Sequence, residues 1–287
     1  MGKTSCSGPR PIPYNAPMKK RALTKISLAI LSSIIVLASP AIALAAQPPS
    51  HGGGGGGGTS STSTTGNDVS FPQCNTSLPT GQLFGIVDVN DGLANTTNPC
   101  FPTELAWARD SVGGTGQDKA ALYVNTADPG NLRVADWPTT GTNQYGTCSG
   151  GDDQACAYQY GWNMAQLDAQ SRIGNNSPSD FKWWLDVETA NSWETNTANN
   201  VADLEGMANY FQSISGRVGL YSTPTQWKEI AGTVSTSSSL YGLDSWLPGA
   251  SSLRELRKNC ALPALTGGKT TVTQYITRSF DYDYSCI

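Results

Sequence analysis

The sequence predicts an α/β fold, a single TIM-like β/α barrel with shortened or missing later helices, stapled by three disulfides. Short strand-like runs alternate with helical patterns early in the chain and crowd together near its end, as in a barrel with degenerate later helices. An even number of cysteines behind an export signal predicts the disulfides. A doubly wound open sheet is the rival fold, but its usual Gly-rich phosphate turn is missing.

Eight strands and three helices are expected. The helix over 199–213 has the clearest pattern, because its apolar residues recur at helical spacing. The other two helices are expected near 103–111 and over 155–172. The expected strands cover 68–71, 84–90, 120–126, 182–189, 217–222, 243–247, 270–277 and 280–284.

The front of the chain has the layout of an export signal. Four basic residues precede an apolar run over 26–46 that closes with a small-residue pattern. We therefore expect residues 1–46 to be a signal peptide, with Met18 as an alternative start. The run is also long enough to span a membrane, but Pro40 and the Ala-rich end favour cleavage.

A low-complexity stretch over 47–66 separates this segment from the rest of the chain. Its run of glycines and its Ser/Thr run cannot form a core, so we expect a flexible linker. A glycosylated stalk would have the same composition. The remaining residues, 67–287, suit one domain with a substantial core.

The expected domain is strongly acidic. Six of the 18 Lys and Arg residues lie in 1–66 and all 22 Asp and Glu residues follow, so 67–287 carries 12 minus 22, or −10. Such a domain repels phosphate backbones, so we expect no nucleic-acid partner. We expect a monomer, with membrane contact only if the N-terminal segment is retained.

Histidine is absent from the expected domain, because the only one, His51, lies in the linker. This excludes a Ser-His-Asp or Cys-His device and a His-ligated zinc site. Any acid–base catalysis must then use Asp and Glu, with Tyr and Lys as the less favoured candidates. No C-x-x-C pair occurs either, so we expect no metal and no other cofactor.

Six cysteines remain in the domain once Cys6, ahead of the export signal, is set aside. Several connectivities are open. We favour the pairing of sequence neighbours, which joins Cys74 with Cys100, Cys148 with Cys156, and Cys260 with Cys286.

The stretch that ends in Glu188 carries the strongest chemical signal. Side chains alternate across a strand, so Trp184, Asp186 and Glu188 share one face. Two carboxylates two residues apart crowd like charges and raise one pKa, which can make a proton donor beside an anionic group. A D-x-E pattern alone favours the structural interpretation over the catalytic one, namely that Asp186 and Glu188 are solvated residues at the end of a strand.

Other strands place polar and aromatic side chains on the same inner face, which favours a site at the carboxyl ends of the strands. Aromatic rings among carboxylates fit sugars, although core packing also uses such rings. Several of these residues could instead shape turns, and two aspartates without further oxygen ligands make a poor calcium motif. The candidate substrate-binding residues are Asp88, Asn90, Tyr123, Asn125, Trp184, Tyr221, Trp246, Gln274 and Asp281, and the candidate catalytic residues are Asp68, Asp186, Glu188 and Asp283.

Six short motifs follow one another in order over the expected domain: Asp68-Val69-Ser70, Leu185-Asp186-Val187-Glu188, Gly219-Leu220-Tyr221-Ser222, Trp246, Gln274-Tyr275 and Asp283. In this order they resemble the motifs of the lysozyme-type glycoside hydrolases of family 25, which cleave peptidoglycan. The resemblance implies Glu188 as general acid, Asp186 as its partner, and Asp68 and Asp283 as supporting carboxylates. It also implies cleavage assisted by the N-acetyl group of the substrate, and it leaves open which Asp steadies the cyclic intermediate.

The second and third strands depart from the usual motifs of that family, which indicates a divergent branch of actinobacterial-type secreted proteins. Chitinase-type barrels fit less well, because their motif would require Asp where Trp184 stands.

The predicted function is hydrolysis of a polysaccharide, the glycan of peptidoglycan, by a secreted or cell-surface protein. A catalytically inactive carbohydrate-binding or surface module on the same barrel is the alternative from another class. It is favoured by the acidity of the domain, which does not suit an anionic cell wall. A third hypothesis is a glycosidase for another secreted polysaccharide.

Overall fold

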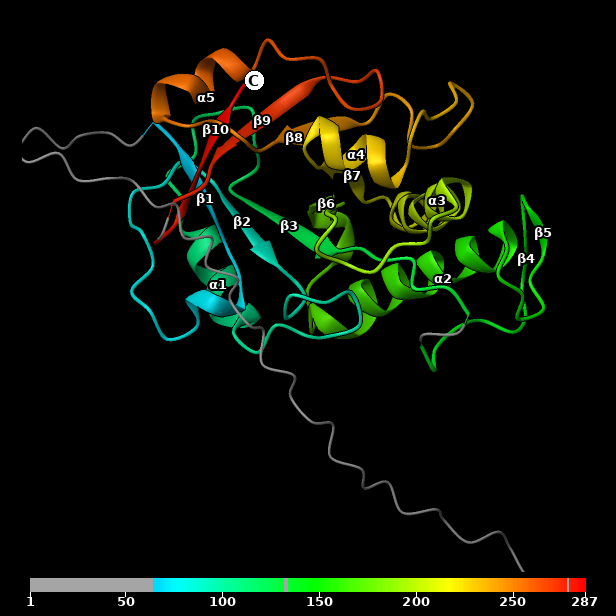
Figure 1. Cartoon of the computed structure of the whole chain (residues 1–287). Helices are drawn as coiled ribbons and strands as arrows, with labels where there is room; N and C mark the ends of the chain where they lie inside the picture. The colour runs from blue at the N-terminus through cyan, green and yellow to red at the C-terminus, as the bar shows by residue number, and fades with distance from the viewer. Residues whose placement is uncertain (1–63, 132–133, 278) are drawn as a thin grey trace, which may run out of the picture. The chain divides into compact units, whose positions relative to one another are not determined.

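The structure, a computed structural model, describes residues 64–131, 134–277 and 279–287 (Figure 1). The predicted signal peptide and most of the predicted linker lie outside these ranges. Within them, no helix combines the length and the apolar character that crossing a membrane requires.

Eight strands close into a barrel in the order β1-β10-β9-β8-β7-β6-β3-β2, which confirms the predicted barrel (Figure 1). Each expected strand overlaps one observed strand, with ends that differ by at most three residues. The strands are β1 (Gly66–Val69), β2 (Gly85–Asp88), β3 (Ala120–Asn125), β6 (Lys182–Asp186), β7 (Arg217–Tyr221), β8 (Asp244–Leu247), β9 (Thr270–Tyr275) and β10 (Asp281–Ser285).

The last strand breaks the all-parallel pattern that a TIM-like barrel implies. Strand β10 runs antiparallel to both of its neighbours, β9 and β1, while the other adjacent pairs in the barrel are parallel. The reason lies in the connection, residues 276–280, which is far shorter than the dozen or more residues that a parallel crossover needs. A hairpin is the only pairing that so short a connection allows.

The helices follow the expected order, and the later ones are short. Helix α2 continues directly into one π-helical turn over 168–172, so the predicted 155–172 segment is helical throughout. Polar N-caps begin four of the five helices, for example Asn196, whose side chain accepts a hydrogen bond from the backbone of Ala198. The helices are α1 (Phe101–Arg109), α2 (Gln154–Leu167), α3 (Thr197–Ser213), α4 (Pro224–Ile230) and α5 (Leu253–Asn259).

Three shorter elements complete the described structure and were not predicted. Two 3-10 turns cover Phe71–Gln73 and Pro178–Asp180. A small hairpin formed by β4 (Thr142–Asn143) and β5 (Gly146–Thr147) lies outside the barrel, next to the N-terminal half of α2 (Figure 1).

The strands separate two apolar clusters, as the alternation of side chains predicts. Trp183, Leu185 and Val187 belong to the cluster between the barrel and the helices, whereas Trp184 belongs to the cluster inside the barrel. Gly219 on β7 leaves room for the Trp184 ring, because a Cβ atom at this position would overlap it. The inner face of β6 therefore carries Trp184 and Asp186, as expected.

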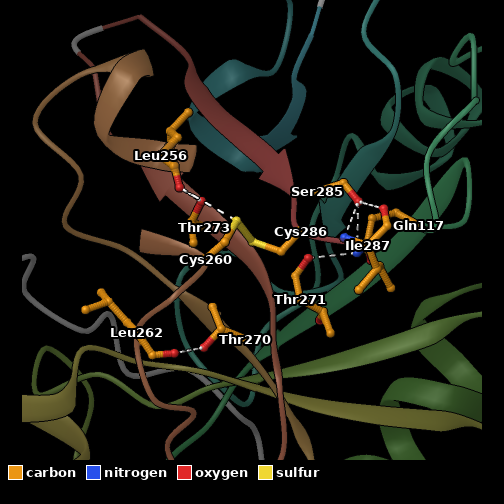
Figure 2. The surroundings of a disulfide bond; sticks show 10 residues. All are labelled: Gln117, Leu256, Cys260, Leu262, Thr270, Thr271, Thr273, Ser285, Cys286 and Ile287. Atoms are coloured by element: carbon orange, nitrogen blue, oxygen red, sulfur yellow. Dashed lines mark hydrogen bonds between the residues drawn. A yellow bond between two sulfur atoms is a disulfide. The ribbon is translucent and has the colours of Figure 1, made fainter. Parts of the chain in front are cut away.

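Three disulfides join the cysteines that are neighbours in sequence: Cys74–Cys100, Cys148–Cys156 and Cys260–Cys286. The last of these links the end of α5 to the residue after β10 (Figure 2). Hydrogen bonds support it, since Thr273 Oγ1 donates to the Leu256 carbonyl at 2.8 Å. Helix α5 is thus fastened to the antiparallel pair β9–β10.

We expect the double substitution Cys260→Ser, Cys286→Ser to lower the free energy of unfolding by about 3 kcal/mol, because opening the 26-residue loop frees the unfolded chain. The measurement is a urea denaturation curve of the wild type and the variant under non-reducing conditions. Equal midpoints and slopes for the two proteins would contradict this expectation.

Candidate active site

A pocket of about 200 Å³ opens at one end of the barrel. It lies where the seven parallel strands end, the place where barrel enzymes carry their chemistry. Eight of the 13 predicted site residues line it, together with one residue that was not predicted. The lining consists of Asp68, Tyr123, Asp186, Glu188, Tyr221, Trp246, Gln274, Ile276 and Asp281.

Most of the lining residues lie at or near the carboxyl ends of the parallel strands, and therefore at a similar level along the barrel axis. Asp186 is the last residue of β6 and Tyr221 the last residue of β7. Since β10 runs the opposite way, its first residue, Asp281, lies at the mouth, directly across from Asp68 in the β1–β10 pairing. Asp283, two residues later, lies deeper and has no exposed surface.

Asp68 does not begin its strand, as the sequence suggested, but lies near the carboxyl end of β1. Its Oδ2 accepts a hydrogen bond from Gln274 Nε2 at 2.8 Å. Burial and, next, repulsion from Asp281 raise the pKa of Asp68 to about 7, against the opposing effect of Gln274 and Asp283. This carboxyl group therefore titrates near neutral pH.

Asp186 is buried inside the mouth, and its Oδ1 has no hydrogen-bond partner among the described residues. Burial raises its pKa well above the ordinary value, and the charges of Glu188, Asp88 and Asp68 add to the effect. Among the described residues that line the pocket, none is a Lys, Arg or His that would oppose this effect.

Glu188 lies two residues beyond the end of β6 and is half-buried. The loop that carries it is held in place, because Trp193 Nε1 donates to the Glu188 carbonyl oxygen at 2.8 Å. Burial raises the pKa of Glu188, while a hydrogen bond with the Gln226 side chain lowers it. Glu188 is thus a carboxylic acid that holds its proton more strongly than usual and borders the pocket beside Asp186.

Five predicted site residues lie behind the pocket wall instead of lining it. Asp88 and Asn125 hydrogen-bond to each other, with Asn125 Nδ2 donating to both Asp88 oxygens at 3.1 and 3.2 Å. Asn90 donates to Asp168, which also pairs with Arg172. These three residues use their polar groups within the protein, so we no longer assign them to substrate.

Trp184 and Asp283 are the other two residues behind the wall. Trp184 is fully buried, with its ring 5.8 Å from that of Trp246 and with Lys182 over its face. Asp283 Oδ1 accepts a hydrogen bond from Trp246 Nε1 at 2.8 Å. Trp184 is a core residue of the barrel, and Asp283 supports the wall from within.

Sequence reasoning missed three residues of the site. Ile276 lines the pocket and is 56 % exposed, and its position two residues after Gln274 could have revealed it. Gln226 and Trp193 approach Glu188 from α4 and from the loop after β6. Nothing in the alternation pattern marks these two, because both lie outside strands. No group of three or more metal-ligating side chains gathers anywhere in the described ranges.

A family described as "Lysozyme-like protein 1" matches residues 164–248. This segment of the chain is similar to that family. It spans β6 to β8 and contains Asp186, Glu188, Tyr221 and Trp246, four residues of the pocket wall. No curated protein matches the chain in sequence.

Several solved structures are similar to the chain. A muramidase from Trichobolus zukalii is 17% identical, with a TM-score of 0.49 over 78% of this chain and 93% of that one. A bacterial lysozyme from Streptomyces coelicolor is 14% identical, with a TM-score of 0.49 over 77% and 91%. A family GH25 lysozyme from Aspergillus fumigatus is 13% identical, with the same TM-score over 77% and 93%.

The crowded carboxyl groups predict how stability depends on pH. Asp68 has an ordinary pKa near 3.8 when unfolded and a pKa of about 7 when folded, so the folded protein binds more protons between these values. Stability contributed by this proton is complete below about pH 4 and is lost as the pH rises through about 7. Asp88, Asp186 and Asp283 have raised pKa values and act in the same direction.

We therefore expect the melting temperature to fall between pH 5 and pH 8. Differential scanning calorimetry at constant ionic strength measures this, and Asp68→Asn should reduce the fall because it removes one of the titrating groups. A melting temperature that rises across this range would contradict the assignment.

Proposed function

We propose that the protein is a glycoside hydrolase that cleaves the glycan of peptidoglycan in the manner of a muramidase. The observation that carries the proposal is the pair Asp186 and Glu188, which border one pocket at the carboxyl ends of the barrel strands. The lysozyme-like match over 164–248, which includes both residues, supports it.

In the proposed reaction Glu188 is the general acid. Its raised pKa keeps the proton available, and this proton passes to the glycosidic oxygen as the bond between that oxygen and the anomeric carbon breaks. The carbonyl oxygen of the neighbouring N-acetyl group then bonds to the anomeric carbon, as the resemblance to family 25 implies. Water opens this cyclic intermediate and gives its proton to the Glu188 carboxylate.

Asp186 is proposed to face the N-acetyl group. Its Oδ1 is buried without a hydrogen-bond partner among the described residues and is placed to accept the N–H of that group as positive charge develops there. Asp68 is proposed to support this pair from the opposite wall, and the rings of Tyr123, Tyr221 and Trp246 to contact the sugar.

The location of the protein is part of the proposal. The three disulfides are consistent with an oxidising compartment. Together with the predicted signal peptide over 1–46 and the predicted linker over 47–66, they support a secreted or cell-surface protein whose domain, 67–287, acts outside the cell.

The test is incubation of the purified protein with peptidoglycan while reducing ends are followed over time. Release that rises with enzyme concentration is expected. Saturable binding without release would replace the proposal with the alternative of an inactive carbohydrate-binding module. Release from another polysaccharide, with none from peptidoglycan, would keep the glycosidase and change its substrate.

A further inference from the structure

A buried chain of hydrogen bonds runs from β7 through β9 to β1. The Tyr221 hydroxyl donates to Gln274 Oε1 at 2.8 Å, and Gln274 Nε2 donates to Asp68 Oδ2 at 2.8 Å. Gln274 is only 2 % exposed, and Tyr221 is buried as well. Both ends of the Gln274 amide are therefore occupied by protein groups, although sequence reasoning assigned this residue to substrate.

The Tyr221 hydroxyl donates to one end of the amide and so matches one of its two orientations. An amide has one accepting and one donating end, and the hydroxyl proton occupies the accepting end of Gln274. The donating end then points at Asp68. With the amide reversed, its oxygen would face a carboxylate oxygen, and two acceptors would meet unless Asp68 held a proton. The observed orientation thus favours the ionised form of Asp68.

Among the described residues, few other groups stabilise the charge of Asp68. Asp281 lies directly opposite it across the β1–β10 pair, and Asp186 and Glu188 border the same pocket. The phenols of Tyr123 and Tyr221 also line this pocket, and none of its described lining residues is a Lys, Arg or His. Among the described residues, the Gln274 amide is a neutral side chain whose hydrogen bond stabilises the charge of Asp68.

Asp283 contacts Asp68 from behind and is fully buried. Trp246 Nε1 occupies its Oδ1, and its Oδ2 has no donor among the described residues. A proton on Oδ2 satisfies this oxygen and removes the repulsion between the two carboxyl groups, as in other close carboxyl pairs that share one proton.

We propose that Gln274, held in one orientation by Tyr221, is a positioning residue that keeps Asp68 ionised toward the pocket while Asp283 holds the proton of the pair. Only the catalytic role of Asp68 rests on the proposed function; the control of its ionisation by Gln274 does not. Because protein groups occupy both ends of the Gln274 amide, its loss is expected to change kcat and its pH dependence and to leave KM nearly unchanged.

The test uses Gln274→Met, which keeps the length of the side chain and removes both polar ends. The Asp68 carboxyl carbon is followed by NMR with 13C-labelled aspartate, and Asp68→Asn assigns the signal. The midpoint of the titration is expected to rise by about one pH unit, because one hydrogen bond to a charged group is lost. Tyr221→Phe should give a smaller rise, because it frees the Gln274 amide to turn.

Thr273→Val is the matched control. It removes a hydrogen bond from the neighbouring residue of β9, the bond to the Leu256 carbonyl shown in Figure 2, without touching Asp68. This variant should melt at a lower temperature with the Asp68 midpoint unchanged. An unchanged midpoint in both Gln274→Met and Tyr221→Phe would overturn the proposal, as would an equal rise in Thr273→Val. If Gln274→Met does not fold, Tyr221→Phe decides alone.

Activity gives a second readout. If the wild type cleaves glycan, the acid limb of its pH profile should move up by about one unit in Gln274→Met at nearly constant KM. A wild type that cleaves no glycan would refute the proposed function, yet the NMR titration would still decide whether Gln274 positions Asp68.

Discussion

Replacing Glu188 by Gln is expected to reduce release of reducing ends from peptidoglycan by about 1000-fold. Glu188 is the proposed proton donor, and a general acid typically contributes 10²- to 10⁴-fold to a rate. Gln keeps the size and most hydrogen bonds of the side chain but has no acidic proton. Because the glycosidic oxygen is a poor leaving group when unprotonated, the effect should appear in kcat with little change in substrate binding.

Glu229→Gln is the matched control for this prediction. Glu229 is exposed on α4 and does not line the pocket, so the same chemical change should leave activity within a factor of two. Equal rates for the wild type and Glu188→Gln would refute the role of Glu188. A melting temperature of Glu188→Gln close to that of the wild type would show that the loss is chemical.

The side of the strand on which each residue lies could be predicted from sequence. The period of two is a property of the extended backbone, so it placed Tyr123, Asp186 and Trp246 inside the barrel without knowledge of the fold. The same rule placed Trp183 and Leu185 under the helices. The disulfide pairing was also predicted from sequence. The structure contains the three expected pairs, each of which joins cysteines that are neighbours in sequence.

Depth along the barrel could not be predicted in this way. Alternation says that Asp88 and Asn90 face inward, but not that side chains from distant parts of the chain cover them. The partner of Asn90 is Asp168, which lies 78 residues later in the π-helical turn and pairs with Arg172. A contact of this kind depends on tertiary packing, and no local pattern in either segment indicates it.

The direction of β10 was within reach of sequence reasoning and was overlooked. The expected strands 270–277 and 280–284 leave only two residues between them, and the observed strands leave five, so either connection requires a hairpin. This reversal places Asp281 at the mouth and Asp283 in the interior, so it decides which of the two carboxyl groups meets solvent. The order of carboxyl groups around Asp68 thus follows from one short connection.

Replacing Asp186 by Asn is expected to lower activity and raise stability together. Activity should fall about 100-fold or more, because a neutral amide does not stabilise positive charge that develops on the N-acetyl group. Stability should rise, because the substitution removes a buried carboxyl group that Glu188, Asp88 and Asp68 repel. Opposite changes of this kind are common where a site holds groups that function requires and folding disfavours.

The gain in stability of Asp186→Asn should depend on pH. This dependence distinguishes the loss of repulsion between carboxylates from improved packing. At pH 8 more of the carboxyl groups around the pocket are ionised and repel one another. Asp186→Asn should then melt about 2–4 °C above the wild type, which corresponds to a gain of ~1 kcal/mol in the free energy of unfolding. At pH 5 the raised pKa of Asp186 favours its protonated form, so the gain in melting temperature should be smaller than at pH 8. Asp91→Asn is the control, because Asp91 is exposed in the loop after β2 and should change neither activity nor melting. A gain of equal size at both pH values would indicate packing and remove the argument that repulsion among the carboxyl groups destabilises this pocket.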